Sequence, residues 1–205
     1  MLEDESMEGD DYYLSLQNEY LYLKYKYGLA AIPGKLWNLL RLRPSNFPCL
    51  RLAQFSELLF REPQLFQQLV QRSDSISVDL FRGCEPHEYW NTHYSFGKKC
   101  RSHSAQLGAS TVELVFINTF APVLFAYGAF MARDELSEEA VAIWERVPFE
   151  ENHITKFYRE KGFPAKSALD SQAILELHHF YCQEKKCTRC RIGGCILSKS
   201  LSCDE

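Results

Sequence analysis

Four cysteines near the end of the 205-residue chain have the residue type and spacing to bind a metal. They follow the pattern C-x4-C-x2-C-x4-C and are Cys182, Cys187, Cys190 and Cys195. The C-x2-C turn can direct two thiolates at one ion, and the basic residues around it favour the thiolate form. The glycine pair at 193–194 gives the backbone freedom to bring the last cysteine back toward the others. We therefore predict a metal centre that is structural rather than catalytic.

The spacing leaves the metal and the fourth ligand open. Zinc sites usually separate two knuckles by a longer loop, whereas a compact cysteine loop after a helix is more like an iron–sulfur binder. An iron–sulfur cluster is therefore slightly favoured over zinc, and the loop is similar to that of the endonuclease III class of DNA glycosylases, although the intervals differ. His178, four residues before Cys182 on the same helical face, and Cys203 are alternative ligands. The competing interpretation is a set of free thiols on a frayed tail.

Basic side chains concentrate in segments without acids, although the net charge is −4. The first eleven residues carry six acids, and the rest of the chain has 23 bases against 21 acids. Residues 20–56 contain no acid and interleave bases with Tyr25, Tyr27 and Trp37, which could contact phosphates and stack on nucleobases. Core aromatics with solvated bases would give the same pattern. The predicted contacts to DNA or RNA are Lys24, Lys26, Arg41, Arg43, Arg51, Arg189 and Arg191.

A third candidate site is the segment EPHEYWNTHYSFG, with Glu85, His87, Glu88 and His93. Its two histidines are six residues apart, unlike those of H-E-x-x-H, which share one helical face. This favours a polar-rimmed packing motif over a catalytic or metal site. The sequence contains no phosphate loop, no G-x-S-x-G elbow and no dinucleotide-binding fingerprint. We do not expect the chain to be an enzyme by itself.

The elements that must position these residues are helices. No segment shows sustained period-two alternation, so we predict an all-α, irregular multi-helix domain. The expected helices lie at 11–27 with Gly28 as the stop, at 31–42, at 48–60, from 63 to 70 or 72, after a cap at Ser110 with a kink at Pro122, after a cap at Ser137, from 152 to 162, and at 168–183.

The expected organisation is an acidic disordered leader at 1–10, a helical domain at 11–180 and a cysteine-rich metal-binding tail at 181–205 that packs on it. The acidic N-terminus lacks the positive charge of a targeting signal, which predicts a cytoplasmic, reducing location. The apolar stretch 112–131 is interrupted by Glu113, Asn118, Thr119 and Pro122. It is predicted to be a buried helix rather than a membrane span.

Five strings closely resemble the C-terminal half of a bacterial family known as domain of unknown function 2851. They are LRLRPSNFPCLRLAQF, EYWNTHYSFG, INTFAPVLFAYG, DSQAILELHHFYC and KKCTRCRIG, and the resemblance runs from about residue 10 to 197. It implies that full-length members carry a restriction-endonuclease-like half with strings such as NAGPDF and VEIH, which do not occur here. The chain then looks like the separate C-terminal portion, either a truncated frame or an excised domain. Any catalytic carboxylates would lie outside it.

The resemblance also bears on the metal ligands. Cys182, Cys187 and Cys190 match the family's C-x4-C-x2-C pattern, whereas Cys195 falls where many members have another residue.

Together these features predict a metal-stapled accessory domain of a nuclease-like protein that binds nucleic acid and is not catalytic alone. The alternative is a protein-interaction module that docks the missing nuclease-like half or a partner subunit. A free-standing metalloenzyme would need an open metal position facing a pocket.

Overall fold

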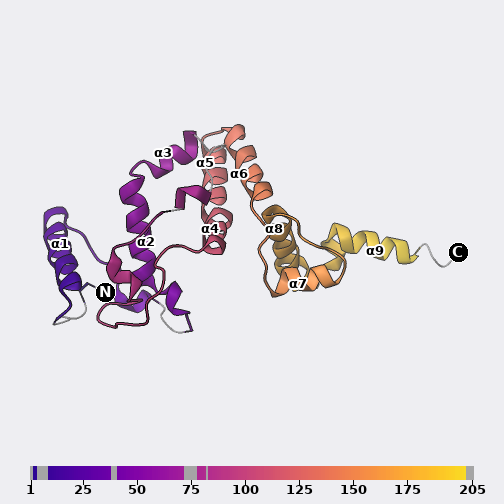
Figure 1. Ribbon diagram of the computed structural model, residues 1–205. Coiled ribbons are helices and arrows are strands. Elements are labelled where there is room, and N and C mark those ends of the chain that lie inside the picture. Colours follow the sequence, from indigo (N-terminus) through magenta and orange to yellow (C-terminus); the bar gives the residue numbers. More distant parts are fainter. Residues whose placement is uncertain (1, 4–8, 38–40, 72–77, 82, 202–205) are drawn as a thin grey trace. The chain divides into compact units, whose positions relative to one another are not determined.

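The computed structural model describes residues 2–3, 9–37, 41–71, 78–81 and 83–201, and Figure 1 traces their helices in chain order. The described residues contain helices and no strand, with a single isolated bridge between His93 and Lys99, so the all-α prediction is confirmed. The chain forms two compact units, a division that the sequence did not predict. Unit 1 comprises residues 1–65 and 79–108, and unit 2 comprises residues 66–78 and 109–205.

The described residues of unit 1 form two α-helices and several short 3₁₀ turns. These elements are α1 (Asp11–Tyr27), η1 (Gly34–Leu36), η2 (Pro44–Asn46), α2 (Pro48–Arg61) and η5 (Glu88–Asn91), and η4 (Val78–Phe81) brings the chain back from unit 2. The core of unit 1 consists of Leu50, Trp90 and Ala105, with Tyr12, Tyr89 and Phe96 packed against them. It therefore joins α2 to the segment EPHEYWNTHYSFG, which confirms that this segment has a packing role.

Helix α1 begins and ends where the sequence predicts. The side chain of Asp10 accepts a hydrogen bond from Tyr13 N at 2.9 Å and caps the first turn. Gly28 ends the helix with φ of 63°, a left-handed conformation in which a Cβ is strained. The expected helix at 31–42 is wrong over the described residues, since only Gly34–Leu36 forms a 3₁₀ turn and Arg41 has φ of 62°. Residues 38–40 lie outside the described part.

Unit 2 contains the remaining α-helices and the cysteine motif. Its elements are α3 (Leu65–Gln71, entered from unit 1), α4 (Ala109–Val115), the π-helical turn η6 (Phe116–Phe120), α5 (Ala121–Phe130), α6 (Asp134–Arg146), α7 (His153–Glu160), α8 (Ala168–Leu177), the π-helical turn η7 (His178–Cys182), the 3₁₀ turn η8 (Cys187–Arg189) and α9 (Arg191–Leu201). Helix α5 packs along α6, and α8 packs against both α6 and α7. Buried side chains on α5 and α6 include Leu124, Ala140 and Ile143.

The long apolar helix has a π-turn directly before Pro122. Ala121 N bonds to Phe116 O instead of Ile117 O, and Ile117 O accepts a hydrogen bond from the Trp144 indole at 3.0 Å. The π-turn therefore supplies a carbonyl that ties the helix to α6. The segment 109–130 is long and apolar enough for a helix that could cross a membrane: its most apolar 18-residue window has a mean hydropathy of 1.5, and 33% of that window is buried. Core helices of soluble proteins pass the same test, so the expectation of a buried helix stays a prediction.

Two helix starts differ from the sequence expectation. Ser110 lies inside α4, which begins at Ala109. Ser137 lies inside α6, which begins at Asp134 with no side-chain cap. The turn between α5 and α6 explains the early start, because Arg133 N bonds to Gly128 O and a Cβ at Gly128 would lie 2.8 Å from Ser137 Oγ. Close approach of the two helices, rather than a capping serine, sets where α6 begins.

Candidate metal centre

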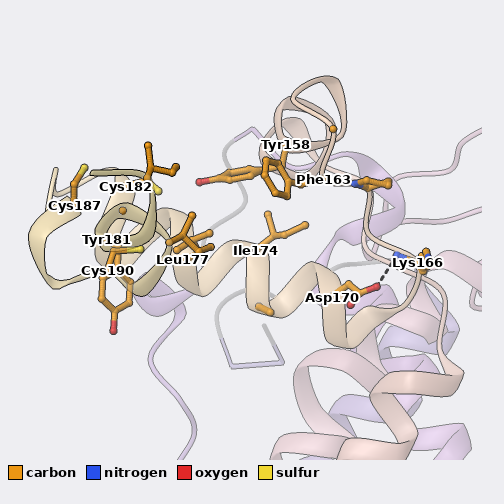
Figure 2. Close-up of a pocket in the computed structure, with 16 residues that line it drawn as sticks. Tyr158, Phe163, Lys166, Asp170, Ile174, Leu177, Tyr181, Cys182, Cys187 and Cys190 are labelled. Atoms are coloured by element: carbon orange, nitrogen blue, oxygen red, sulfur yellow. Dashed lines mark hydrogen bonds between the residues drawn. The ribbon is translucent and has the colours of Figure 1, made fainter. Parts of the chain in front are cut away.

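A cavity of about 900 Å³ in unit 2 contains three of the four predicted cysteine ligands. Its walls come from α7 and the loop after it, from α8, and from the segment formed by η7, η8 and α9. Figure 2 shows Cys182, Cys187 and Cys190 at one end, with Lys166 and Asp170 at the other and Ile174 between. Local caps explain how the walls are held: Asn152 and Thr155 form a reciprocal capping box at the start of α7, and Ser167 caps α8.

The three cysteines reach the cavity from three consecutive short elements. Cys182 ends η7, Cys187 begins η8, and Cys190 lies directly before α9. The C-x2-C turn is closed by a hydrogen bond of 3.2 Å from Cys190 N to Cys187 O, and Cys190 O accepts from Gly194 N at 2.8 Å. The backbone therefore holds Cys187 and Cys190 in one tight turn at the start of a helix.

Tyr158 of α7 is a polar neighbour of this cysteine end, and no sequence pattern indicated it. Burial first, then a hydrogen bond with the Cys182 side chain and the charges of Cys182 and Cys190, together raise the pKa of Tyr158 to about 12. The ring of His178 meets Tyr158 edge to face at 6.0 Å. In the described structure His178 Nδ1 is buried and has no hydrogen-bond partner, an arrangement that normally costs stability.

These residues have the donor atoms that a thiophilic metal needs, but their side chains do not lie close enough together to bind one. Thiolates and an imidazole are the ligands that zinc and iron–sulfur centres use, and an orphaned histidine nitrogen beside them suits a fourth ligand. Within the described residues, however, no three His, Cys, Asp or Glu side chains gather closely enough to hold an ion. A metal would therefore require the C-x2-C turn to close on Cys182.

The other proposed ligands lie elsewhere. Cys195 is an exposed residue of α9 and does not belong to the described residues that line the cavity. Cys203 lies outside the described residues. The cavity thus brings together Cys182, Cys187 and Cys190, while neither His178 nor Cys195 is among the residues that line it.

Two of the predicted phosphate contacts, Lys24 and Lys26, lie in the last turn of α1. The Lys26 ammonium is 5.5 Å from the ring centre of Tyr22 and 5.1 Å from that of Tyr27. Lys24 forms an ion pair with Glu3. Cation–π attraction therefore orients Lys26, and the carboxylate of Glu3 orients Lys24.

The arginines predicted to contact nucleic acid differ in their exposure and in their hydrogen bonds. Arg41 and Arg43 are exposed in the segment between α1 and α2. Arg51 is half-buried and donates to Gln54 Oε1 at 2.9 Å and to Asn46 Oδ1 at 2.6 Å, and burial lowers its pKa. Arg189 and Arg191 are exposed in unit 2. Arg51 thus has a structural task in unit 1 that the sequence did not indicate.

A model of the family described as "Protein of unknown function (DUF2851)" matches residues 1–153, three quarters of the chain. The chain belongs to this family. The matched DUF2851 residues include all of unit 1 and the long apolar helix of unit 2, but they end at the start of α7. The cysteine motif and its cavity lie beyond the match, whereas the resemblance seen in the sequence ran to about residue 197. Neither the curated proteins nor the solved structures contain a significant match.

Proposed function

We propose that this chain is a non-catalytic accessory module of the DUF2851 family that binds DNA or RNA through unit 1. One observation carries the proposal: α1 exposes aromatic rings beside the ammonium group of Lys26. The exposed fractions are 57% for Tyr22, 92% for Tyr25 and 62% for Tyr27. Rings this exposed contribute little to folding, and the Lys26 ammonium lies over two of them, Tyr22 and Tyr27.

The geometry of α1 suits a nucleic-acid strand. Residues three and four apart share a helical face, so Tyr22 lies beside both Tyr25 and Lys26. Exposed tyrosines can stack on unpaired bases, while the lysines neutralise phosphates. Arg41 and Arg43 follow in the same unit with their side chains exposed. Arg51 contributes less in this proposal because its guanidinium is already bonded to Asn46 and Gln54.

The second part of the proposal concerns the tail. Cys182, Cys187 and Cys190, with His178 or Cys195 as the fourth ligand, would bind zinc or an iron–sulfur cluster and fix η8 and α9 on α8. Metal binding of this kind contributes folding free energy directly. Its support is the shared cavity and the orphaned His178 nitrogen. Arg189 and Arg191 would then add contacts to the same nucleic acid.

The nucleic-acid proposal is tested by fluorescence anisotropy with short labelled single-stranded and duplex oligonucleotides. The affinity should fall steeply between about 50 and about 200 mM salt. Lys26→Gln should reduce the slope of log affinity against log salt by about 1. Lys161→Gln is the matched control, because Lys161 also lies over an aromatic ring, 5.8 Å from Phe157, but belongs to unit 2. Salt-independent binding, or no binding to any oligonucleotide, would overturn the proposal.

The metal proposal is tested by anaerobic purification, metal analysis and a visible spectrum. Broad absorbance with iron and sulfide identifies a cluster, whereas colourless protein with one equivalent of zinc identifies a zinc site. Cys187→Ser should remove the metal, and Cys100→Ser, in unit 1, should not. Metal-free protein under these conditions counts against the metal while leaving the α1 surface intact.

A second candidate function is the docking of a nuclease-like half of the family. Helix α2 exposes Leu52, Phe55 and Leu59 at positions i, i+3 and i+7, which form one apolar stripe. Co-expression of the chain with that half should yield a stable complex that Phe55→Glu disrupts. If the complex forms and no oligonucleotide binds, docking replaces nucleic-acid binding as the function.

A further inference from the structure

Four aromatic rings in unit 1 form a continuous column. His87 stacks on Tyr12 with ring centres 4.5 Å apart, Tyr12 stacks on Tyr89 at 4.5 Å, and Tyr89 stacks on His93 at 3.8 Å with 6° between planes. Tyr12 comes from α1, and the other three rings come from the segment EPHEYWNTHYSFG. Among the described residues only Tyr12 stacks on His87, so His87 is an end of the column.

A cavity of about 400 Å³ lies at this end of the column. His87 lines it together with polar side chains that can read the edge of a ligand, and with a small apolar floor at Ala105. The polar groups that matter here are Glu85, Glu88, Asn91 and Gln106. The cavity has the volume of many small-molecule binding sites. Such sites usually combine aromatic or apolar side chains with a few convergent polar groups, as this cavity does.

Hydrogen bonds hold the floor and rim of this cavity in place. Ala105 N donates to Asn91 Oδ1 at 3.3 Å, and Ala105 O accepts from Gln54 Nε2 at 2.8 Å. Gln54 is only 2% exposed, so this support is deeply buried. On the rim, Gln106 Nε2 donates to Glu85 Oε1 at 2.5 Å. A site fixed in this way loses little entropy when it binds a ligand.

The lining determines which chemistry fits. The two carboxylates repel a phosphate or any other anion, and the part of the chain that the structure describes offers no three-ligand set for a metal ion. A planar group that donates N–H bonds, neutral or cationic, suits this lining. Among nucleobases, guanine presents adjacent N–H donors at N1 and N2, which one carboxylate can accept together.

We propose that this cavity binds one unpaired nucleobase, preferably guanine, stacked on His87 and read by Glu88 or Glu85. The inference deepens the proposed nucleic-acid function by naming single strands with an extruded base as the substrate class. Proteins commonly hold splayed-out bases between aromatic or histidine rings and polar edge readers. The phosphates of such a strand stay outside the cavity, where α1 supplies the lysines.

The test uses the four nucleoside monophosphates and an NMR titration of histidine-labelled full-length chain. Guanosine monophosphate should shift the ring protons of His87 saturably and bind more tightly than the other three nucleotides. His87→Ala should weaken binding about tenfold, because stacking of one base accounts for roughly that factor, whereas His87→Phe keeps a flat ring and should retain most of the affinity. Glu88→Gln should reduce the preference for guanine, and Glu19→Gln, an exposed acid of α1, is the control.

The outcomes separate this inference from the nucleic-acid function. If oligonucleotides bind but His87 does not respond to any nucleotide, or His87→Ala binds as wild type, the base pocket is wrong and the α1 surface stands. If guanosine monophosphate binds at His87 but no oligonucleotide does, the pocket stands as a mononucleotide site and the proposed function fails. Equal affinity for all four nucleotides would overturn guanine recognition by the carboxylates.

Discussion

Gly193 packs directly against Cys187. A Cβ at position 193 would lie 2.4 Å from the Cys187 carbonyl oxygen and 3.0 Å from its Cα, and backbone atoms cannot move aside as a flexible side chain does. This contact holds the first turn of α9 against the C-x2-C turn. Gly193 is therefore required for steric reasons, whereas the sequence analysis explained the glycine pair only by its backbone flexibility.

Gly193→Ala is therefore expected to separate α9 from η8. Forcing an extra methyl group into a close contact typically costs about 1–3 kcal/mol. Hydrogen exchange of residues 187–198 should speed up, and Cys187 should react faster with iodoacetamide. Gly194→Ala is the control, since its Cβ would meet nothing within 4 Å. That change should stabilise the helix by about 0.5–1 kcal/mol. Equal behaviour of the two variants would contradict the contact.

Asp10 should make the stability of unit 1 depend on pH in the acid range. Partial burial raises the pKa of Asp10, but hydrogen bonds from Tyr89 Oη, Tyr13 N and Gly97 N outweigh burial and hold it below the ordinary 3.8. A carboxyl with a depressed folded-state pKa stabilises the fold above its unfolded value, and this stabilisation is lost as the pH falls through the folded value. The contribution is therefore complete at neutral pH and disappears below about pH 4.

Asp10→Asn isolates this effect because asparagine is also a good N-cap. The variant should be less stable than wild type by about 1 kcal/mol at neutral pH, where the charged hydrogen bond from Tyr89 is lost. Urea unfolding at pH 7 and near pH 3 should show the difference shrinking in acid. Asp11→Asn, the neighbouring exposed acid, should change little at either pH. A difference that is constant with pH would show that the charge of Asp10 is not responsible.

Gln54 should be the polar residue of α2 that is hardest to replace. Its amide lies inside the core of unit 1 and donates to Ala105 O, while its carbonyl accepts from Arg51. Gln54→Leu has a similar volume but leaves a buried carbonyl without its donor, which costs about 1–3 kcal/mol. Chemical denaturation should show this loss, and Ser56→Ala, at an exposed position of α2, should stay within about 0.5 kcal/mol of wild type.

The pKa of Tyr158 should report on the cysteine end of the cavity. Burial accounts for the largest part of its rise from 10.0 to about 12, and Cys182 adds a hydrogen bond and a charge. Cys182→Ala should lower this pKa without restoring 10.0, because burial remains. An NMR titration of labelled tyrosine measures it. Cys195→Ala should leave it unchanged, since Cys195 lies outside the described lining of the cavity.

The same shift has a consequence for stability in alkali. A group whose folded-state pKa is raised stabilises the fold below its unfolded value and loses that contribution as the pH rises through the folded value. Tyr158 therefore favours the folded chain up to about pH 10, and the benefit falls away between about pH 10 and pH 12. If Cys182→Ala left the titration of Tyr158 unaltered, the hydrogen bond between them would be absent.

Local rules predicted the ends of helices better than they predicted their buried faces. Gly28 and Pro48 mark the end of α1 and the start of α2 as expected, because a left-handed residue and a missing N–H act within one turn. The buried residue of α1 is Tyr13, whereas Leu21 and Tyr27 of the same helix are exposed. Tyr13 is buried by a tertiary contact. The ring of Phe96, more than eighty residues away in the sequence, has its centre 5.2 Å from the centre of the Tyr13 ring.

The candidate site was predictable only where its residues are close in the sequence. The spacing of Cys182, Cys187 and Cys190 indicated a shared location, and they share a cavity. Tyr158 could not be identified, because nothing in the sequence fixes how α7 lies against α8. The ring column was missed for the same reason, since Tyr12 reaches His87 only through the folding of α1 onto a distant segment.

The path of the chain between the units has a consequence for how this protein can be divided. The chain leaves unit 1 at residue 65, returns to it at residue 79 and leaves again after residue 108. A cut after residue 65 therefore leaves all of unit 2 attached to residues 79–108 of unit 1, and a cut after residue 108 leaves all of unit 1 attached to residues 66–78 of unit 2. Any fragment that one cut makes and that holds one unit whole thus also carries a segment of the other unit.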